Sequence, residues 1–294
     1  MGGPAELVAP EVVSGRFVEG MSEDEYHAHP SLSSTGMKEL LRSAKYYRMR
    51  RSLHRAKAEF DEGHAVHALV LGVGAPIVEI PASILASNGA ISTREAKAFV
   101  DEARQAGQVP LKPDTFARIT RAAEAILANE KARVLLEKPG FTEVSLFATD
   151  PATGVDLRCR FDRLTADLLP VDVKSTTDVS VRKIERSVVD FGYDVQAFAY
   201  RYVLSLVLGV AVDEVEPMTF IFAEKDLPHE VRVVRLADPV WAAGGEQKMR
   251  AAIDLFAWCT EQGVWPGDDE DGGPVMDLPA PGWYRAQTTE VEVY

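Results

Sequence analysis

Residues 160–176 read Arg160-Phe-Asp-Arg-Leu-Thr-Ala-Asp-Leu-Leu-Pro-Val-Asp-Val-Lys-Ser-Thr176, and this stretch decides the fold. Its alternating apolar residues, interrupted by a short polar break, predict two strands joined by a turn. Side chains two apart on a strand share a face, so Asp172 and Lys174 are expected to project side by side. Asp162 lies on the preceding strand, and its carboxylate is expected to converge with that of Asp172.

Two convergent carboxylates form an oxygen-rich site that suits Mg²⁺ or Mn²⁺. A metal there can lower the pKa of a bound water and offset charge on a phosphoryl oxygen. A neighbouring lysine can position or activate that water and stabilise the developing charge. The pattern therefore indicates phosphodiester hydrolysis, with an ordinary surface ion pair as the alternative.

The acid-x-Lys spacing alone is weak evidence, because it occurs twice more in this chain. Glu95-Ala-Lys97 and Glu246-Gln-Lys248 have the same spacing. Both lie in helical patterns, where residues two apart do not share a face. The strand context and the upstream Asp162 distinguish Asp172-Val-Lys174 from these two.

The order of expected elements indicates an α/β protein with a mixed sheet and helices packed on it. An antiparallel meander is followed by a crossover helix and further strands. The expected helices are one starting near Met37, 63–71, a helical segment 84–140, 194–208 and 239–263. The expected strands are 141–149, 155–164, 168–175, 217–223 and 230–236.

Composition limits the class of protein. The chain has 294 residues, 46% of them hydrophobic, and a net charge of −13. No apolar run approaches the roughly 20 residues that span a bilayer, and the first ten residues do not resemble a signal peptide. Two distant cysteines, Cys159 and Cys259, form neither a disulfide framework nor a cysteine metal cage. We expect a cytoplasmic protein without a membrane partner.

A basic segment stands out against the acidic total. Eight lysines and arginines fall between Lys38 and Lys57, with Glu39 as the only acid. Phosphate contacts are made by such residues, although a solvated helix face explains the pattern equally well. Ser31–Ser34 is most simply a helix cap. A more specific interpretation is that its hydroxyl and N–H groups contact a phosphate. The candidate DNA-binding residues are Ser33, Ser34, Lys38, Arg42, Lys45, Arg50 and Arg51.

Several motifs together resemble one nuclease group. Residues 160–164 and 171–176 resemble the second and third motifs of PD-(D/E)XK nucleases. Gln196 and Tyr200 resemble the Gln-x-x-x-Tyr motif of its RecB-like branch, and Gly63-His-Ala-Val-His67 resembles the Gly-x-x-x-His helix of that branch. Residues 21–27 and 30–34 resemble the start of RecE-type phage and prophage exonucleases, the exodeoxyribonuclease VIII-like group.

The resemblance implies a restriction-endonuclease-like core and a set of site residues. Metal ligands would be His67, rather than His64, with Asp162 and Asp172, and the Val173 carbonyl as a further candidate. Lys174 would assist the water, and Gln196 and Tyr200 would organise the site, although both could be helix-surface residues. Glu143 resembles an acidic position of related nucleases, or is a solvent-facing strand residue. The expected ion is Mg²⁺, with Mn²⁺ as a substitute. The four-cysteine iron–sulfur subgroup is excluded.

The implied activity is exonucleolytic. RecE-type enzymes digest linear double-stranded DNA from 5′ ends and leave 3′ single strands for an annealing protein, and related enzymes form closed rings around the duplex. The alternatives are a structure- or site-specific endonuclease of the same fold and a non-catalytic DNA-binding protein. The expected organisation is a flexible leader (1–20), one nuclease domain (21–265) with a helical insertion (84–140), and an irregular acidic tail (266–294).

Overall fold

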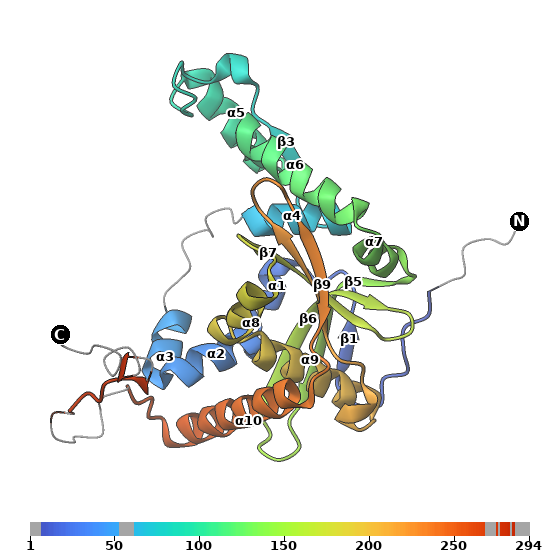
Figure 1. Ribbon diagram of the computed structural model, residues 1–294, viewed down its shortest axis with the longest axis vertical. Helices are drawn as coiled ribbons and strands as arrows, with labels where there is room; N and C mark the ends of the chain where they lie inside the picture. The colour runs from blue at the N-terminus through green and yellow to red at the C-terminus, as the bar shows by residue number, and fades with distance from the viewer. Residues whose placement is uncertain (1–6, 53–61, 268–274, 276, 283, 286–294) are drawn as a thin grey trace, which may run out of the picture.

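A mixed sheet with helices on both faces forms the centre of the computed structural model (Figure 1). The structure describes residues 7–52, 62–267, 275, 277–282 and 284–285. The predicted fold class is confirmed. Among the described residues, no helix combines the length and apolar character needed to cross a membrane.

The main sheet has the strand order β1-β5-β6-β7-β8-β9. Along this order all neighbours are antiparallel except β7 and β8, which run parallel, and the short strand β2 (Leu32–Ser33) pairs with β6 outside this order. The five strands expected from the alternating pattern are all present, with small shifts at their ends. Their bounds are β5 (Gly140–Thr149), β6 (Asp156–Thr165), β7 (Pro170–Thr176), β8 (Thr219–Glu224) and β9 (Val231–Arg235).

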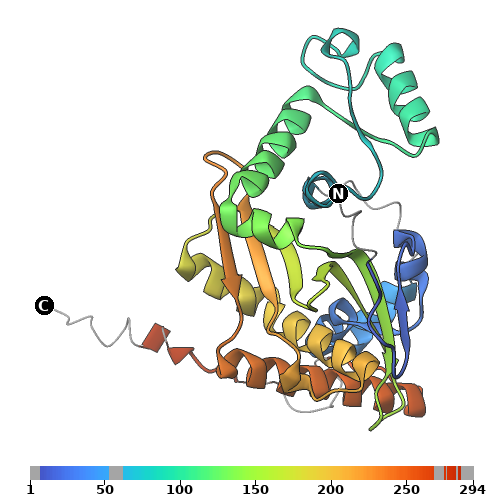
Figure 2. The same ribbon diagram turned by 90° about the vertical axis from the view of Figure 1, so that its right-hand side faces the viewer.

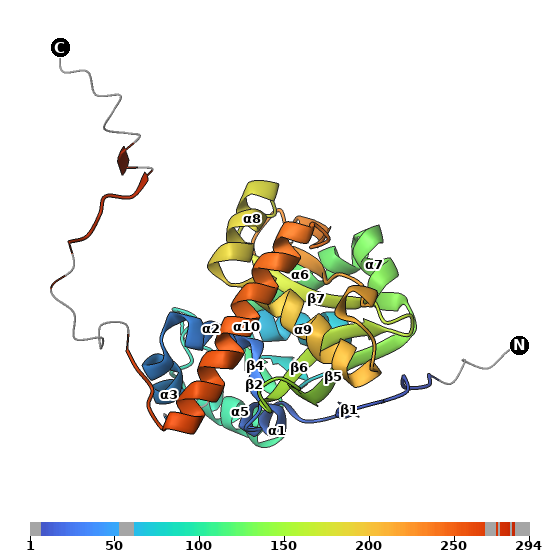
Figure 3. The ribbon, with the colours of Figure 1, turned by 90° about the horizontal axis from the view of Figure 1, so that it is seen from below.

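One face of the sheet is covered by helices that include the crossover. A parallel pair needs a crossover connection, and here α8 (Val181–Asp190) and α9 (Tyr193–Leu208) link β7 to β8. The helix α9 packs against α10 (Pro239–Gln262) and α2 (Ser34–Arg42), as the view from below shows (Figure 3). The sequence predicts α2, α9 and α10 but not α8.

The other face is covered by α4 (Glu62–Leu71) and α6 (Pro113–Ala128), with α7 (Glu130–Glu137) following α6. Apolar residues of α4 and α6 form a second core with Val171 and Val173 of β7. Two of the helices in the expected insertion 84–140 therefore contribute to the core. The helix α5 (Arg94–Gln105), η1 (Ala82–Ile84) and a small parallel sheet, β3 (Ile77–Glu79) with β4 (Val109–Leu111), form a projecting arm, into which α6 also runs (Figures 1 and 2).

The edge of β6 that faces β7 pairs with two different strands, β2 and β7, and we call the opening between them the fork. Near its beginning, β6 pairs in parallel with β2 (Leu32–Ser33) at Leu157 and Arg158. Near its end, it pairs with β7 at Arg163 and Leu164. Between these two short ladders, β6 has no strand partner on that side in the described part of the chain. Asp162 lies in this gap, directly beside the last bridged pair.

In both β5 and β6, the alternation of inward-facing and outward-facing side chains shifts by one residue at the level of Asp162. Val144, Leu146 and Ala148 of β5 face the first core, but so does Phe141, three residues before Val144. The slip occurs at Glu143, whose φ of 51° lies in the left-handed region. β6 shows the same slip between Phe161 and Leu164, which pair with Val144 and Phe141. The register places Glu143 opposite Asp162, and this pair alone interrupts the β5–β6 ladder.

The expected loose leader is only partly irregular. Residues 16–18 form β1 (Arg16–Val18), which pairs with β5, so the leader prediction is wrong for that stretch. It is followed by α1 (Glu23–Ala28), which Ser22 and Glu25 cap. A further helix, α3 (Ala44–Ser52), follows α2, and η2 (Val212–Glu214) precedes β8. Most of the expected acidic tail lies outside the described residues.

Candidate metal centre

A cleft of about 740 Å³ opens at the fork of the sheet. It is bounded by α1, α2 and α4, by the arm, and by the start of α9. Nine of the expected site residues, although far apart in the sequence, line this one cleft. They are Ser34, Lys38, His67, Glu143, Asp162, Asp172, Lys174, Gln196 and Tyr200.

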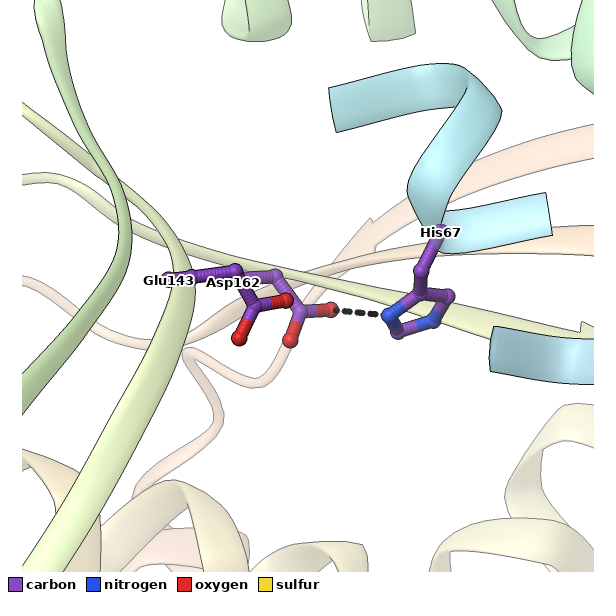
Figure 4. Close-up of side chains that lie close together, drawn as sticks. All are labelled: His67, Glu143 and Asp162. Atoms are coloured by element: carbon purple, nitrogen blue, oxygen red, sulfur yellow. Dashed lines mark ion pairs between the residues drawn. The ribbon is translucent and has the colours of Figure 1, made fainter. Parts of the chain in front are cut away.

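Three of these side chains form a cluster of potential metal ligands. One ligand atom from each of His67, Glu143 and Asp162 lies within 4.8 Å of the other two. Figure 4 shows the two carboxylates side by side, with the imidazole approaching from α4. His67 Nδ1 lies 3.4 Å from Asp162 Oδ2, and Nε2 donates to the Val173 carbonyl 2.7 Å away.

Asp162 is buried at the fork and bridges it. Its Oδ2 accepts a hydrogen bond of 2.7 Å from the backbone N–H of Val173 on β7. This bond satisfies an N–H group that the strand ladder leaves free on that side. Burial and the nearby charge of Asp172 raise the pKa of Asp162, against the opposing influence of His67.

Glu143 reaches the cluster because of its left-handed backbone, a conformation uncommon for a side chain of this kind. Burial, and then the charge of Asp162, raise its pKa to about 7, although Arg160 opposes the shift. The Arg160 Nε lies 3.9 Å from Glu143 Oε2. When no cation is bound, the protonated form of this pair of carboxyl groups is therefore favoured.

Asp172 lies on β7, across the fork from Asp162. Its Oδ1 accepts a 2.6 Å hydrogen bond from Gln196 Nε2 on α9, and its Oδ2 lies 2.6 Å from Lys174 Nζ. Gln196 therefore fixes the orientation of this carboxylate. Asp172 is not part of the His67–Glu143–Asp162 cluster, although its charge acts on Asp162.

The pKa of Lys174 lies above its ordinary value, so its ammonium group is charged at neutral pH. Burial alone would lower its pKa, but Asp172 and Asp162 outweigh burial and raise it. A lysine held in this way is a fixed positive charge at neutral pH and not a proton acceptor. Its Nζ also lies 5.2 Å from the ring centroid of Tyr193, the first residue of α9.

Tyr193 and Arg160 line the same cleft but were not among the residues proposed from sequence. Tyr193 precedes Gln196 by three residues and Tyr200 by seven, so helical spacing alone could have identified it. Tyr200 itself is buried and packs edge-to-face on Phe161, with 5.1 Å between ring centroids. Arg160 binds the carbonyls of Met21 and Ser22 and so ties α1 to β6.

The chemistry of the donors fits a hard divalent cation. Two carboxylates with raised pKa values and an imidazole face one another across a short gap, which a cation can bridge in place of protons. His67, Glu143 and Asp162 would hold the ion. Asp172 and the Val173 carbonyl lie next to this group, but each already has a protein partner.

The start of α2 forms the wall of the cleft opposite these acids. Ser33 caps α2 by accepting a hydrogen bond from the N–H of Gly36, so the cap expected from sequence is confirmed. Ser34 and Lys38, four residues apart, both line the cleft. Among the described residues, Lys38 makes no ion pair. Burial, and then the charge of Lys174, lower its pKa to about 8.

The remaining residues of the basic segment lie away from the cleft lining. Arg42 packs over the Tyr46 ring at 4.1 Å, Arg50 pairs with Glu39 at 3.3 Å, and Lys45 is exposed on α3. The side chains of Arg51 and His64, together with residues 53–61, lie outside the described part of the chain.

Two comparisons with known proteins agree with this architecture. The family described as a PDDEXK-like domain of unknown function (DUF3799) matches residues 33–272. A crystal structure described as "Putative exonuclease" from Eubacterium rectale has a TM-score of 0.57 and 14% sequence identity, and the match covers 94% of this chain and 100% of that chain. At that identity, the likeness concerns the fold.

A second solved structure, SSO0001, is more distant. The match covers 66% of this chain and 87% of that chain, with 10% sequence identity and a TM-score of 0.26. No curated protein sequence matches this chain.

Proposed function

Because this chain belongs to the family of PDDEXK-like domains of unknown function (DUF3799), we propose that it is a metal-dependent deoxyribonuclease, and specifically an exonuclease. The observation that carries the proposal is the meeting of Asp162, Glu143 and His67 with the Asp172–Lys174 pair in one cleft. A bound Mg²⁺ or Mn²⁺ supplies a water of lowered pKa and offsets phosphoryl charge.

The residues of the chain divide the work between two sides of the fork. His67, Glu143 and Asp162 would hold the ion, while Gln196 keeps the Asp172 carboxylate turned toward the cleft. Lys174 provides a fixed positive charge beside Asp172, where it orients the attacking water and stabilises the negative charge that develops on the phosphoryl oxygens.

DNA would enter along α2. Lys38 places a second positive charge near Lys174, and the N-terminus of α2 contributes N–H groups to the same wall. Arg42, Lys45 and Arg48 would continue this basic surface along α2 and α3, where all three are exposed. Phosphates would therefore find a local attractive path on a protein whose total charge is −13.

The finer proposal follows from the resemblance to RecE-type exonucleases. The substrate would be linear double-stranded DNA, digested from 5′ ends, and the 3′ single strands would pass to an annealing protein. A homo-oligomeric ring would gather one basic surface from each subunit around the duplex. Such a ring would reconcile the acidic total charge with processive digestion.

End-labelled linear duplex and a covalently closed circle test the proposal directly. We expect release of nucleotides from the linear duplex with Mg²⁺, none with EDTA, and an intact circle. Asp172→Asn should abolish release, whereas Glu95→Gln, the acid of a Glu-x-Lys pair on exposed α5, should not. Cleavage of the circle would indicate an endonuclease, and a lack of metal-dependent hydrolysis on any DNA would refute the nuclease proposal.

A further inference from the structure

An aromatic side chain stands exposed beside the cleft. Phe191 caps the C-terminal end of α8, where its N–H donates to the Ser187 carbonyl at 3.0 Å, and 57% of the residue is exposed. Its ring contacts Tyr193, with centroids 5.7 Å apart and planes at 37°. Tyr193 lines the cleft, whereas Phe191 lies just outside its lining. The two rings therefore form a step from the surface into the site.

The step is rigidly supported. Tyr193 stacks on Phe220 of β8 at 5.7 Å and 29°, so the sheet holds it from behind. Gly192 turns the chain between the two rings with a φ of 61°. A Cβ at this position would lie 2.8 Å from Cδ of Lys38, so the glycine also leaves room for the lysine stem.

Positive charge lies next to the rings. The Lys174 Nζ is 5.2 Å from the Tyr193 ring centroid, and the Lys38 stem runs against Gly192. An exposed aromatic face beside two lysines in a cleft has the chemistry of a nucleotide: a flat base against the ring and a phosphate against the ammonium groups. A purely apolar partner would leave Lys38, which makes no ion pair among the described residues, without a counter-charge, whereas Lys174 already pairs with Asp172.

We propose that the Phe191–Tyr193 step stacks an unpaired nucleobase of the DNA strand whose phosphate enters the cleft. This inference rests on the proposed nuclease function and adds a preference for substrates with at least one unpaired base beside the site. Stacking tolerates all four bases, because each has a flat aromatic face. The exposed edge of Phe191 would thus hold the strand in place while Lys38 and Lys174 engage its phosphates.

Binding without metal tests the inference separately from catalysis. A short single-stranded oligonucleotide containing 2-aminopurine, titrated in EDTA, should lose fluorescence as the base stacks on the wild-type protein. Phe191→Ala should restore the fluorescence and weaken binding by about tenfold. Phe191→Tyr should behave like wild type. Val189→Ala, which alters an aliphatic residue equally exposed at 57% on the same helix, should also leave binding unchanged.

Salt dependence separates stacking from phosphate contact. The slope of log affinity against log salt concentration should be unchanged in Phe191→Ala and reduced by about one in Lys38→Ala. Unchanged fluorescence in the wild type, an inert Phe191→Ala, or equal loss in Val189→Ala would each overturn the stacking site. Stacking without Mg²⁺-dependent hydrolysis would refute the nuclease proposal alone, and hydrolysis that is indifferent to Phe191 would refute the stacking site alone.

Discussion

The carboxylate of Asp162 accepts a 2.7 Å hydrogen bond from the backbone N–H of Val173, and this bond joins the two strands of the site where their ladder has ended. Asp162 therefore has two roles. It is a candidate metal ligand, and it satisfies a backbone donor in a buried position.

The two roles of Asp162 can be separated by two substitutions. Asp162→Asn and Asp162→Ala should both abolish Mg²⁺-dependent hydrolysis. Only the alanine variant leaves the Val173 N–H without an acceptor, at a loss of about 1–3 kcal/mol in the free energy of unfolding. Thermal and urea denaturation without metal check this difference. Near-normal turnover in either variant, or equal stability of the two, contradicts the assignment.

Lys174 should act on the rate and not on affinity. Lys174→Ala should lower the rate constant on the order of 10² or more, because it removes a fixed charge beside the reacting phosphoryl group. DNA affinity, which depends on many phosphate contacts, should change little. Single-turnover kinetics and binding in EDTA measure the two effects, with Lys97→Ala as the control. A defect confined to binding would make Lys174 a phosphate clamp.

Glu143 should make the metal-free protein less stable as the pH rises. Its folded pKa of about 7 exceeds that of an unfolded glutamate, so the folded state binds more protons in this interval. Stability should therefore fall between about pH 4.5 and 7. Melting temperatures across this range should fall less in Glu143→Gln than in wild type. An identical pH profile in the two proteins contradicts the shift.

The same protons compete with the metal. Binding of a cation to Glu143 and Asp162 must displace them, so the Mn²⁺ concentration for half-maximal activity should rise as the pH falls below 7. One displaced proton gives about a tenfold rise per pH unit. Calorimetry in buffers of different ionisation enthalpy counts the released protons. Metal binding that is independent of pH would place the ion elsewhere.

His67 should set the metal requirement. His67→Ala removes one of the three clustered ligands and should raise the Mg²⁺ or Mn²⁺ requirement steeply. His64→Ala, three residues earlier, is the control and should have little effect. Metal titrations of activity and of direct Mn²⁺ binding provide the measurement. Equal, mild effects at both positions would leave His67 with a structural role only.

The exposed arginines of α2 and α3 should govern processivity. Arg42→Glu with Arg48→Glu should cripple digestion of long duplex, because the variant repels phosphates along the proposed path. Metal binding should persist. The matched control reverses Lys131 and Arg133, two exposed cations on α7, which is not part of the proposed path along α2 and α3. Light scattering that shows a monomer, together with unchanged processivity, would exclude the ring.

The sequence predicts most of the sheet because its strands alternate clearly and sharp turns separate them. The elements predicted from the sequence also place Asp162, Asp172, Lys174 and Gln196 on neighbouring strands and the helix that follows them. The short strands β1 and β2 could not be predicted, since pairing with β5 and β6, and not local propensity, makes them extended. The helix α8 was detectable, because Ile184 and Val188 have helical spacing behind the cap Ser180.

The grouping of the ligands is harder to derive. A strict period of two treats Asp162 and Asp172 as the pair that converges. The slip at Glu143 and Asp162 breaks that period, so Asp162 joins His67 and Glu143, while Asp172 joins Lys174 and Gln196. A left-handed glutamate inside a strand has no sequence signal, because glutamate rarely adopts that conformation.

The forked edge of β6 also affects how the two halves of the site are spaced. A continuous ladder fixes neighbouring strands about 4.8 Å apart. At the level of Asp162, a single side-chain hydrogen bond replaces that ladder. The prongs of the fork can therefore widen or narrow with little loss of backbone hydrogen bonding. Glu143 and Asp162 lie on β5 and β6, whose ladder continues on both sides of this pair, so the spacing of these two ligands does not depend on the fork. A shift of β7 would instead change the distance between Asp162 and the Asp172–Lys174 pair.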